Sequence, residues 1–263
     1  MKSLFIFALL SSFGCGQPQV QTGWRPAVLK EVGIEQHLGV QIPLDIPFAD
    51  ESGKSVTLRK YAQRPIILAL VYYQCPSLCN MVLNGVLRSI RNLGLNAGED
   101  YDIVAVSIDP RETSEMATAK KASYMKGYDR AGADRGWHFL TGPAASTKCL
   151  ADAAGFHFAY DPLTNQFAHG SAIIILTPGG RVARYFFGID YPARDVRLSL
   201  EEASGGRIGS PIDAILLYCY HYDPSNGKYG MVIMNVLRLA GLVTVAALAI
   251  FLLAMFRRDL RVT

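Results

Sequence analysis

The chain has 263 residues, of which 50% are hydrophobic, and its formal net charge at pH 7 is +4. This length suggests one domain of ordinary size with accessory segments, and the apolar fraction is enough for a sizeable core. The basic residues are scattered and do not form a stripe with interleaved aromatic residues. The composition therefore argues against a protein that binds nucleic acid.

The N-terminus has the three-part layout of a secretory signal. Lys2 precedes an apolar run at residues 4–10, and small residues follow before Cys15. This run is too short to span a bilayer. We expect residues 1–14 to be a signal peptide. Lipid attachment to Cys15 stays open, because Ser12 stands where lipoprotein signals usually have leucine.

A second apolar segment near the C-terminus does not belong to a soluble core. Residues 239–256 carry no charge, and a helix of this length rises roughly 27 Å, close to the apolar thickness of a bilayer. Arg257 and Arg258 follow at once and favour a cytoplasmic C-terminus. We expect a transmembrane helix over residues 231–256 and a cytoplasmic tail over residues 257–263. The main domain then lies outside the cytoplasm; the alternative interpretation is a buried core helix.

Strand and helix patterns alternate between these end segments, from residue 43 to residue 205. The apolar runs predict a hairpin over 43–61 and then strands at 66–72, 103–108, 139–140, 156–160, 172–176 and 182–187. Helical spacing predicts helices that follow the cysteine pair up to residue 93 and then cover 114–128, 144–154 and 192–202.

This order of elements predicts an α/β sandwich with a mixed central sheet. The same order occurs in thioredoxin-like folds, so a thioredoxin-like domain is expected over residues 43–205. Residues 15–42 are expected to be a linker, and residues 206–230 a juxtamembrane segment.

Two cysteines, Cys75 and Cys79, lie where the strand at residues 66–72 passes into the following helix. Residues four apart share a helical face, so the two sulfurs can approach each other. The helix N-terminus favours negative charge, which predicts a lowered thiol pKa. Such a pair suits redox chemistry or a soft metal ion, whereas a plain disulfide would close too small a loop to add much stability.

A third ligand would distinguish a metal site from a redox pair, because two thiolates and one imidazole suit copper(I). His169 precedes the predicted strand at residues 172–176, and in a thioredoxin-like layout this loop faces the cysteines. Thioredoxins have a cis-proline there, whereas this chain has no proline between Pro162 and Pro178. Three other histidines lie in the linker or beside core aromatic residues, where histidine is usually structural: His37, His138 and His157.

Four features of the sequence then point to a family. They are the motif CPSLC at residues 75–79, VSIDP at 106–110, WHFLTG at 137–142, and His169 with its following strand and TPGG turn. In these features the chain resembles the SCO/SenC family of copper proteins that serve cytochrome c oxidase. The resemblance covers about residues 43–203.

The resemblance implies that Cys75, Cys79 and His169 hold one copper ion, as copper(I) or copper(II). It also implies a role in delivering copper to the CuA centre of cytochrome c oxidase subunit II, or in reducing the cysteines of that centre. Asp109 matches a family position near the site, where it would support the ligands or dock a partner. The alternative for Asp109 is a turn or helix-capping role.

The chain departs from the family in its anchor, since many members have an N-terminal membrane helix and this one adds a C-terminal helix. Cys219 and His221 precede that helix and could form a second copper site near the membrane; the alternative is ordinary aromatic packing at the interface. Cys149 lies in an alanine-rich helix and is expected to be a buried small apolar residue.

The expected function is that of a copper chaperone rather than an enzyme, at the bacterial cell membrane with the main domain on the periplasmic side. A rival function is a thiol–disulfide oxidoreductase, in which Cys75 attacks and Cys79 resolves. A peroxiredoxin-like peroxidase is disfavoured, because Leu68 and Tyr72 occupy the positions of that family's proline and hydroxyl residue.

Overall fold

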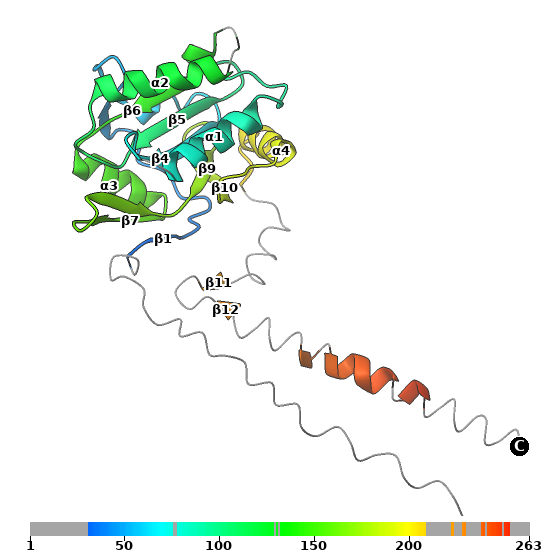
Figure 1. The fold of residues 1–263 in the computed structure, drawn as a ribbon. Coiled ribbons are helices and arrows are strands. Elements are labelled where there is room, and N and C mark those ends of the chain that lie inside the picture. Colours follow the sequence, from blue (N-terminus) through cyan, green and yellow to red (C-terminus); the bar gives the residue numbers. More distant parts are fainter. Residues whose placement is uncertain are drawn as a thin grey trace, which may run out of the picture.

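A five-stranded mixed sheet forms the centre of the fold (Figure 1). This computed structural model describes residues 31–75, 78–128, 130, 132–208, 222–223, 228–229, 238–239, 241–248 and 250–252. The strand order is β10-β9-β4-β5-β6, in which β5 runs parallel to β4 and β6, and β9 runs antiparallel to β4 and β10. The strands cover Ile66–Val71 (β4), Asp102–Ser107 (β5), Trp137–Leu140 (β6), Ala172–Leu176 (β9) and Val182–Phe187 (β10).

The central sheet confirms the predicted α/β class with a mixed sheet. Every residue of β4 and of β5 is buried, as expected of strands that are covered on both faces. Helix α1 contacts β4 and lies between α2 and α4, while α3 contacts strand β7 (Phe156–Asp161). The helices cover Leu78–Ile90 (α1), Ser114–Tyr128 (α2), Ala144–Ala153 (α3) and Ala193–Ser204 (α4).

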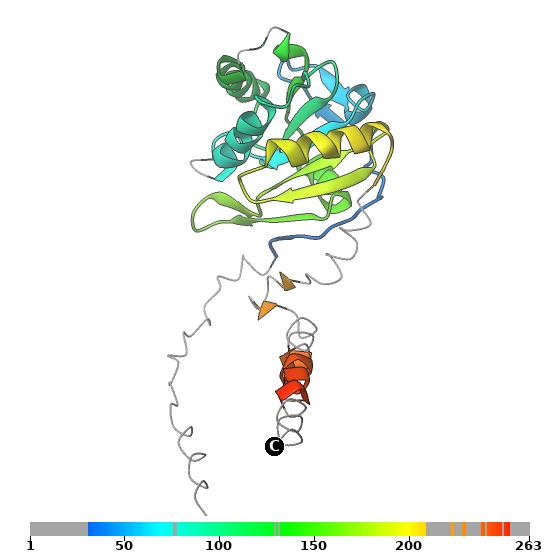
Figure 2. The same cartoon turned by 90° about the vertical axis from the view of Figure 1, so that its right-hand side faces the viewer.

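A second, smaller sheet carries the order β1-β7-β8 and lies beside the central sheet (Figure 2). Its strands are Gly33–Ile34 (β1), Phe156–Asp161 (β7) and Gln166–His169 (β8), and β7 and β8 form an antiparallel hairpin. Two sequence expectations change here. His169 ends a strand instead of lying in a loop, and β1 falls inside the segment that was expected to be a linker.

Short elements complete the described part of the chain. The predicted hairpin near the start of the domain is present as β2 and β3, which pair antiparallel. The short elements are Pro47–Ala49 (β2), Ser55–Thr57 (β3), Leu58–Lys60 (η2), Ala133–Arg135 (η3), Tyr222–Asp223 (β11) and Lys228–Tyr229 (β12).

The prediction that Cys149 is buried is wrong. Cys149 is exposed on α3, whose inward face is formed by Ser146, Thr147, Leu150 and Ala151. In an alanine-rich helix the apolar pattern is weak on every face, so the sequence does not show which residues point inward.

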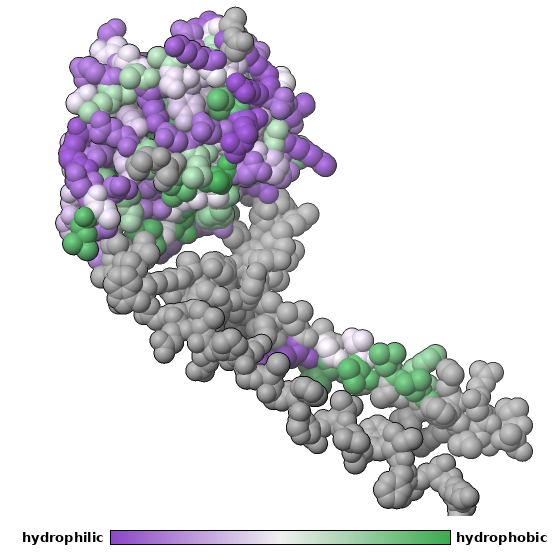
Figure 3. Space-filling view, in the orientation of Figure 1, coloured by the Kyte–Doolittle hydropathy of each residue, from purple (hydrophilic) through white to green (hydrophobic). Residues whose placement is uncertain are grey.

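No helix within the described residues is long and apolar enough to cross a membrane. Residues 238–239, 241–248 and 250–252 are helical, and their apolar side chains are exposed (Figure 3). The rest of the predicted span at 231–256 lies outside the described residues, so the transmembrane helix stays a prediction. The signal peptide at 1–14, the tail at 257–263, and Cys15, Cys219 and His221 also lie outside them.

The backbone at Ile189 approaches helix α1 closely, and this approach depends on the absence of a side chain at Gly85. A Cβ atom at this position would lie 2.2 Å from the carbonyl oxygen of Ile189 and 3.0 Å from the ring of Tyr191. Helix α1 therefore packs directly against the loop that leads into α4.

The first prediction concerns Gly85→Ala. In an open helix this change stabilises by about 1 kcal/mol, but here the clash should destabilise the domain by about 1–3 kcal/mol. Urea unfolding of the reduced protein measures the change. Asn84→Ala, at the exposed neighbouring position, is the control and should leave stability equal or slightly higher. A gain in stability for Gly85→Ala would contradict the close packing.

Candidate metal centre

The cysteine pair lies at the junction between β4 and α1. Neither Cys75 nor Cys79 forms a disulfide, and both are buried. The backbone N–H of Cys79 donates to Cys75 Sγ at 3.4 Å, and the N–H of Tyr72 donates to Cys79 Sγ at 3.5 Å. Each sulfur therefore accepts a hydrogen bond from the backbone of the turn, which fixes the pair beside the first turn of α1.

The ring of His169 reaches this pair from the other sheet. Its Nε2 lies 3.0 Å from Cys79 Sγ, and its Nδ1 lies 2.6 Å from the carbonyl oxygen of Gly170. For Nδ1 to donate to that carbonyl it must carry the proton, which leaves the lone pair of Nε2 directed at the sulfur. Burial lowers the pKa of His169 below its usual 6.5, so the imidazole is neutral in neutral solution.

Burial dominates the thiol chemistry as well. It raises the pKa of Cys79 far above the usual value of 9.0, and the N–H of Tyr72 only partly opposes this. The expectation of a lowered thiol pKa is thus wrong for Cys79, because loss of hydration outweighs the field of the helix N-terminus. Without a metal, Cys79 keeps its proton, and a bound cation would have to displace it.

The structure brings together two of the three expected ligands, Cys79 and His169. Cys75 lies next to them, and its thiol is hydrogen-bonded with Cys79 and with the hydroxyl of Tyr72. Within the described part of the chain, no group of three or more His, Cys, Asp or Glu side chains is arranged to hold a metal ion. Two thiols and a neutral imidazole are nevertheless donors that copper(I) prefers, so the chemistry of the set fits copper.

Tyr72 is a site residue that the sequence reasoning did not assign. Its hydroxyl contacts Cys75, and its ring meets the ring of His169 edge-on at 5.9 Å between centroids. Burial raises its pKa, so the hydroxyl stays protonated. The available signal was its place at the end of the buried strand, three residues before Cys75.

Lys120 is a second unassigned residue, from the middle of α2. Its Nζ donates to the carbonyl of Tyr73 at 2.8 Å and also to the side-chain oxygen of Asn80, whose amide nitrogen donates to the carbonyl of Cys75 at 3.0 Å. Burial lowers the pKa of Lys120. Through these hydrogen bonds the Lys120 side chain ties α2 to the cysteine turn.

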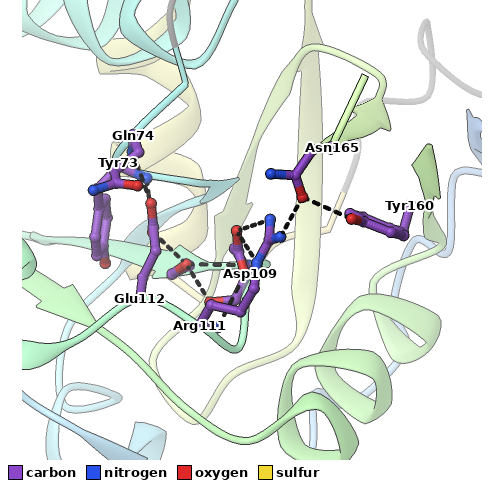
Figure 4. Close-up of polar contacts among 8 residues, drawn as sticks. Tyr73, Gln74, Asp109, Arg111, Glu112, Tyr160 and Asn165 are labelled. Atoms are coloured by element: carbon purple, nitrogen blue, oxygen red, sulfur yellow. Dashed lines mark hydrogen bonds and ion pairs between the residues drawn. The ribbon is translucent and has the colours of Figure 1, made fainter. Parts of the chain in front are cut away.

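Asp109 is buried and serves the turn after β5 (Figure 4). Its carboxylate forms an ion pair with Arg111, with 2.6 Å between Nη2 and Oδ2, and accepts the backbone N–H of Arg111 at 2.9 Å. Among the described residues, its side-chain hydrogen bonds go to Arg111 and not to Cys79 or His169. The turn role is what the contacts support.

Comparison with known proteins places this geometry in context. A family model described as SCO1/SenC matches residues 41–202. A crystal structure of a protein of proposed electron-transfer function from Aquifex aeolicus VF5 is 27% identical, with a TM-score of 0.58, over 66% of this chain and 98% of its own. No curated protein matches the chain.

Two Sco structures share the fold at lower identity. ScoI of Arabidopsis thaliana, solved with copper bound, is 17% identical with a TM-score of 0.52, over 64% of this chain and 99% of its own. BsSco, a member of the Sco family of cytochrome c oxidase assembly proteins in which a disulfide switch was identified, is 18% identical with a TM-score of 0.50, over 67% and 98%. Neighbouring Sco structures are thus solved with copper bound.

The lowered pKa of His169 gives a prediction for the metal-free, reduced protein. The unfolded chain binds a proton at this histidine more readily than the folded one, so its contribution to stability is complete above the usual value of 6.5 and falls as the pH drops below it. His169→Gln should remove this part of the pH dependence in urea unfolding at pH 5 to 8. His157→Gln, which removes a side chain that is 38% exposed, should keep it. An unchanged pH profile in His169→Gln would contradict the burial of the ring.

Proposed function

This chain belongs to the SCO1/SenC family, and we propose on that basis that it binds copper through Cys75, Cys79 and His169 and passes it to another copper protein. The observation that carries the proposal is the 3.0 Å approach of His169 Nε2 to Cys79 Sγ, between residues 90 positions apart. This contact joins the first turn of α1 to the end of β8, which is where a bound ion would need its ligands.

The chemistry of the three side chains suits a cargo that must be held and then released. Copper(I) would displace the proton of each thiol that binds it, while the neutral imidazole offers a lone pair without losing a proton. A site of three donors leaves the ion open to a fourth ligand. An incoming thiolate or imidazole of a recipient could therefore take the ion by stepwise ligand exchange.

The proposed recipient is the CuA centre of cytochrome c oxidase subunit II. BsSco, with the same fold, is a member of a family of cytochrome c oxidase assembly proteins, which supports this choice. The Cys75–Cys79 pair could also reduce the cysteines of that centre before copper is loaded.

A second candidate function, thiol–disulfide exchange, is favoured by one observation. The side chains of Cys75 and Cys79 are hydrogen-bonded to each other and are not joined by a disulfide. The thiolate of Cys75 would attack a target disulfide and form a mixed disulfide, and Cys79 would then displace the target as a dithiol. The pair on this chain would end oxidised, so a further thiol reductant would be needed for each cycle.

The proposal includes the location of the domain in a bacterial cell. A signal peptide at residues 1–14 and a transmembrane helix at residues 231–256 would hold it at the outer face of the cell membrane. Supporting this, apolar side chains of residues 239–252 that the structure describes are exposed, as they would be toward lipid.

Copper titration tests the main proposal. The reduced protein should bind one equivalent of copper and show a copper(II)–thiolate absorption band. His169→Ala and Cys75→Ser should each lower the affinity at least about 100-fold, because each removes a ligand, whereas His157→Ala should bind like the parent. If His169→Ala binds copper like the parent and retains disulfide reductase activity, the oxidoreductase function replaces the copper function.

Labelling of Cys149 tests the location, because this thiol is exposed on α3. A membrane-impermeant maleimide should modify the full chain in intact spheroplasts, and Cys149→Ser should lose most of the label. Labelling that needs lysis of the cells would place the domain in the cytoplasm and refute this part of the proposal.

A further inference from the structure

The turn after β5, residues 109–112, touches both halves of the site (Figure 4). Its Glu112 reaches the cysteine turn, and its Arg111 reaches the β7–β8 hairpin that ends in His169. We propose that Glu112 and Arg111 are positioning residues, which set the cysteine side and the histidine side of the copper site separately. This inference rests on the proposed copper function.

The Glu112 contacts are short and shielded from solvent. Its Oε2 accepts the backbone N–H of Tyr73 and its Oε1 that of Gln74, both at 2.7 Å, and Ser107 Oγ lies 2.6 Å from Oε2. Glu112 is only 7% exposed. A carboxylate is required here because both oxygens accept, whereas an amide would turn a donor toward one of the two N–H groups. Glu112 thereby fixes the backbone directly before Cys75.

The Arg111 contacts hold the hairpin near its tip. The guanidinium group binds the carboxylate of Asp109 through Nε and Nη2, and its Nη1 donates to the side-chain oxygen of Asn165 at 2.7 Å. Its Cζ also lies 5.3 Å from the ring centroid of Tyr160 and 5.7 Å from that of Phe167. The guanidinium group uses its N–H donors for these hydrogen bonds and its flat faces for the contacts with the two rings. Lysine offers neither geometry, so it cannot replace arginine here.

The hairpin needs this support because its strands do not pair with the central sheet. Strand β8 is hydrogen-bonded to β7, and β7 to β1, in a sheet of their own. Asn165, at the turn of the hairpin, has a positive φ of 56°, and its side chain also accepts from the hydroxyl of Tyr160 at 2.7 Å. Arg111 thus holds the hairpin turn itself, a few residues before His169.

The side chains of Arg111 and Glu112 differ in solvent exposure, and this difference assigns their roles. The Arg111 side chain is 50% exposed, whereas Glu112 is buried. Hydrogen bonds at the surface exchange with water more readily than buried ones. The cysteine side is therefore the fixed half of the site, and the histidine side is the half that can yield when cargo is exchanged.

The test compares Arg111→Lys and Glu112→Gln, with Arg135→Lys and Glu115→Gln as exposed controls. In the metal-free protein, Arg111→Lys should speed backbone hydrogen exchange of residues 166–169 and leave the alkylation rate of Cys75 unchanged. Glu112→Gln should speed the alkylation of Cys75 and leave backbone hydrogen exchange of residues 166–169 unchanged. Each should weaken copper binding about 10- to 100-fold, as loss of a group that orients a ligand does, and the controls should match the parent.

The outcomes separate the possible failures. If Arg111→Lys and Glu112→Gln change both metal-free measurements alike, the turn is a general stabiliser and the separate roles are refuted; unchanged measurements refute them as well. Should Glu112→Gln fail to fold, Ser107→Ala removes one contact of the same carboxylate and should accelerate alkylation of Cys75 more weakly. A parent protein that binds no copper refutes the proposed function, while the metal-free measurements still decide the positioning roles.

Discussion

The contact between Cys79 Sγ and His169 Nε2 is the interaction on which the site depends. It joins the first turn of α1, which follows β4 of the central sheet, to the imidazole at the end of β8 in the smaller sheet. Neither sulfur nor imidazole could be held there by local sequence alone. The site exists because the chain crosses the domain and returns, so its geometry is a property of the whole fold.

Burial of that contact explains the electrostatics of the site. Removing water disfavours both the thiolate of Cys79 and the imidazolium of His169, so the metal-free pair is a neutral thiol beside a neutral imidazole. Such a pair has no net charge to attract hard cations such as calcium or magnesium. Soft cations bind sulfur strongly enough to displace the proton, so burial acts as a filter on the kind of ion that can enter.

The central sheet and its helices could be predicted from the sequence, because strands buried on both faces appear as continuous apolar runs, as β4 and β5 do. The cysteine pair could be located for the same reason, since it directly follows β4. Strand β8 could not be predicted, because it is short, half-buried and without clear alternation. The raised pKa of Cys79 could not be predicted either, since the helix N-terminus is visible in the sequence whereas the residues that exclude water come from distant segments.

Lys120 and Glu112 show why such a site needs opposite charges beside it. Glu112 accepts the backbone N–H groups of Tyr73 and Gln74, while Lys120 donates to the carbonyl of Tyr73, so the same short turn is held from its donor side and its acceptor side. A turn held in both ways cannot rotate a peptide unit without breaking a charged hydrogen bond. The rigidity of the cysteine side therefore comes from α2 and the turn before it, and in the proposed copper exchange the hairpin would be the part that adjusts.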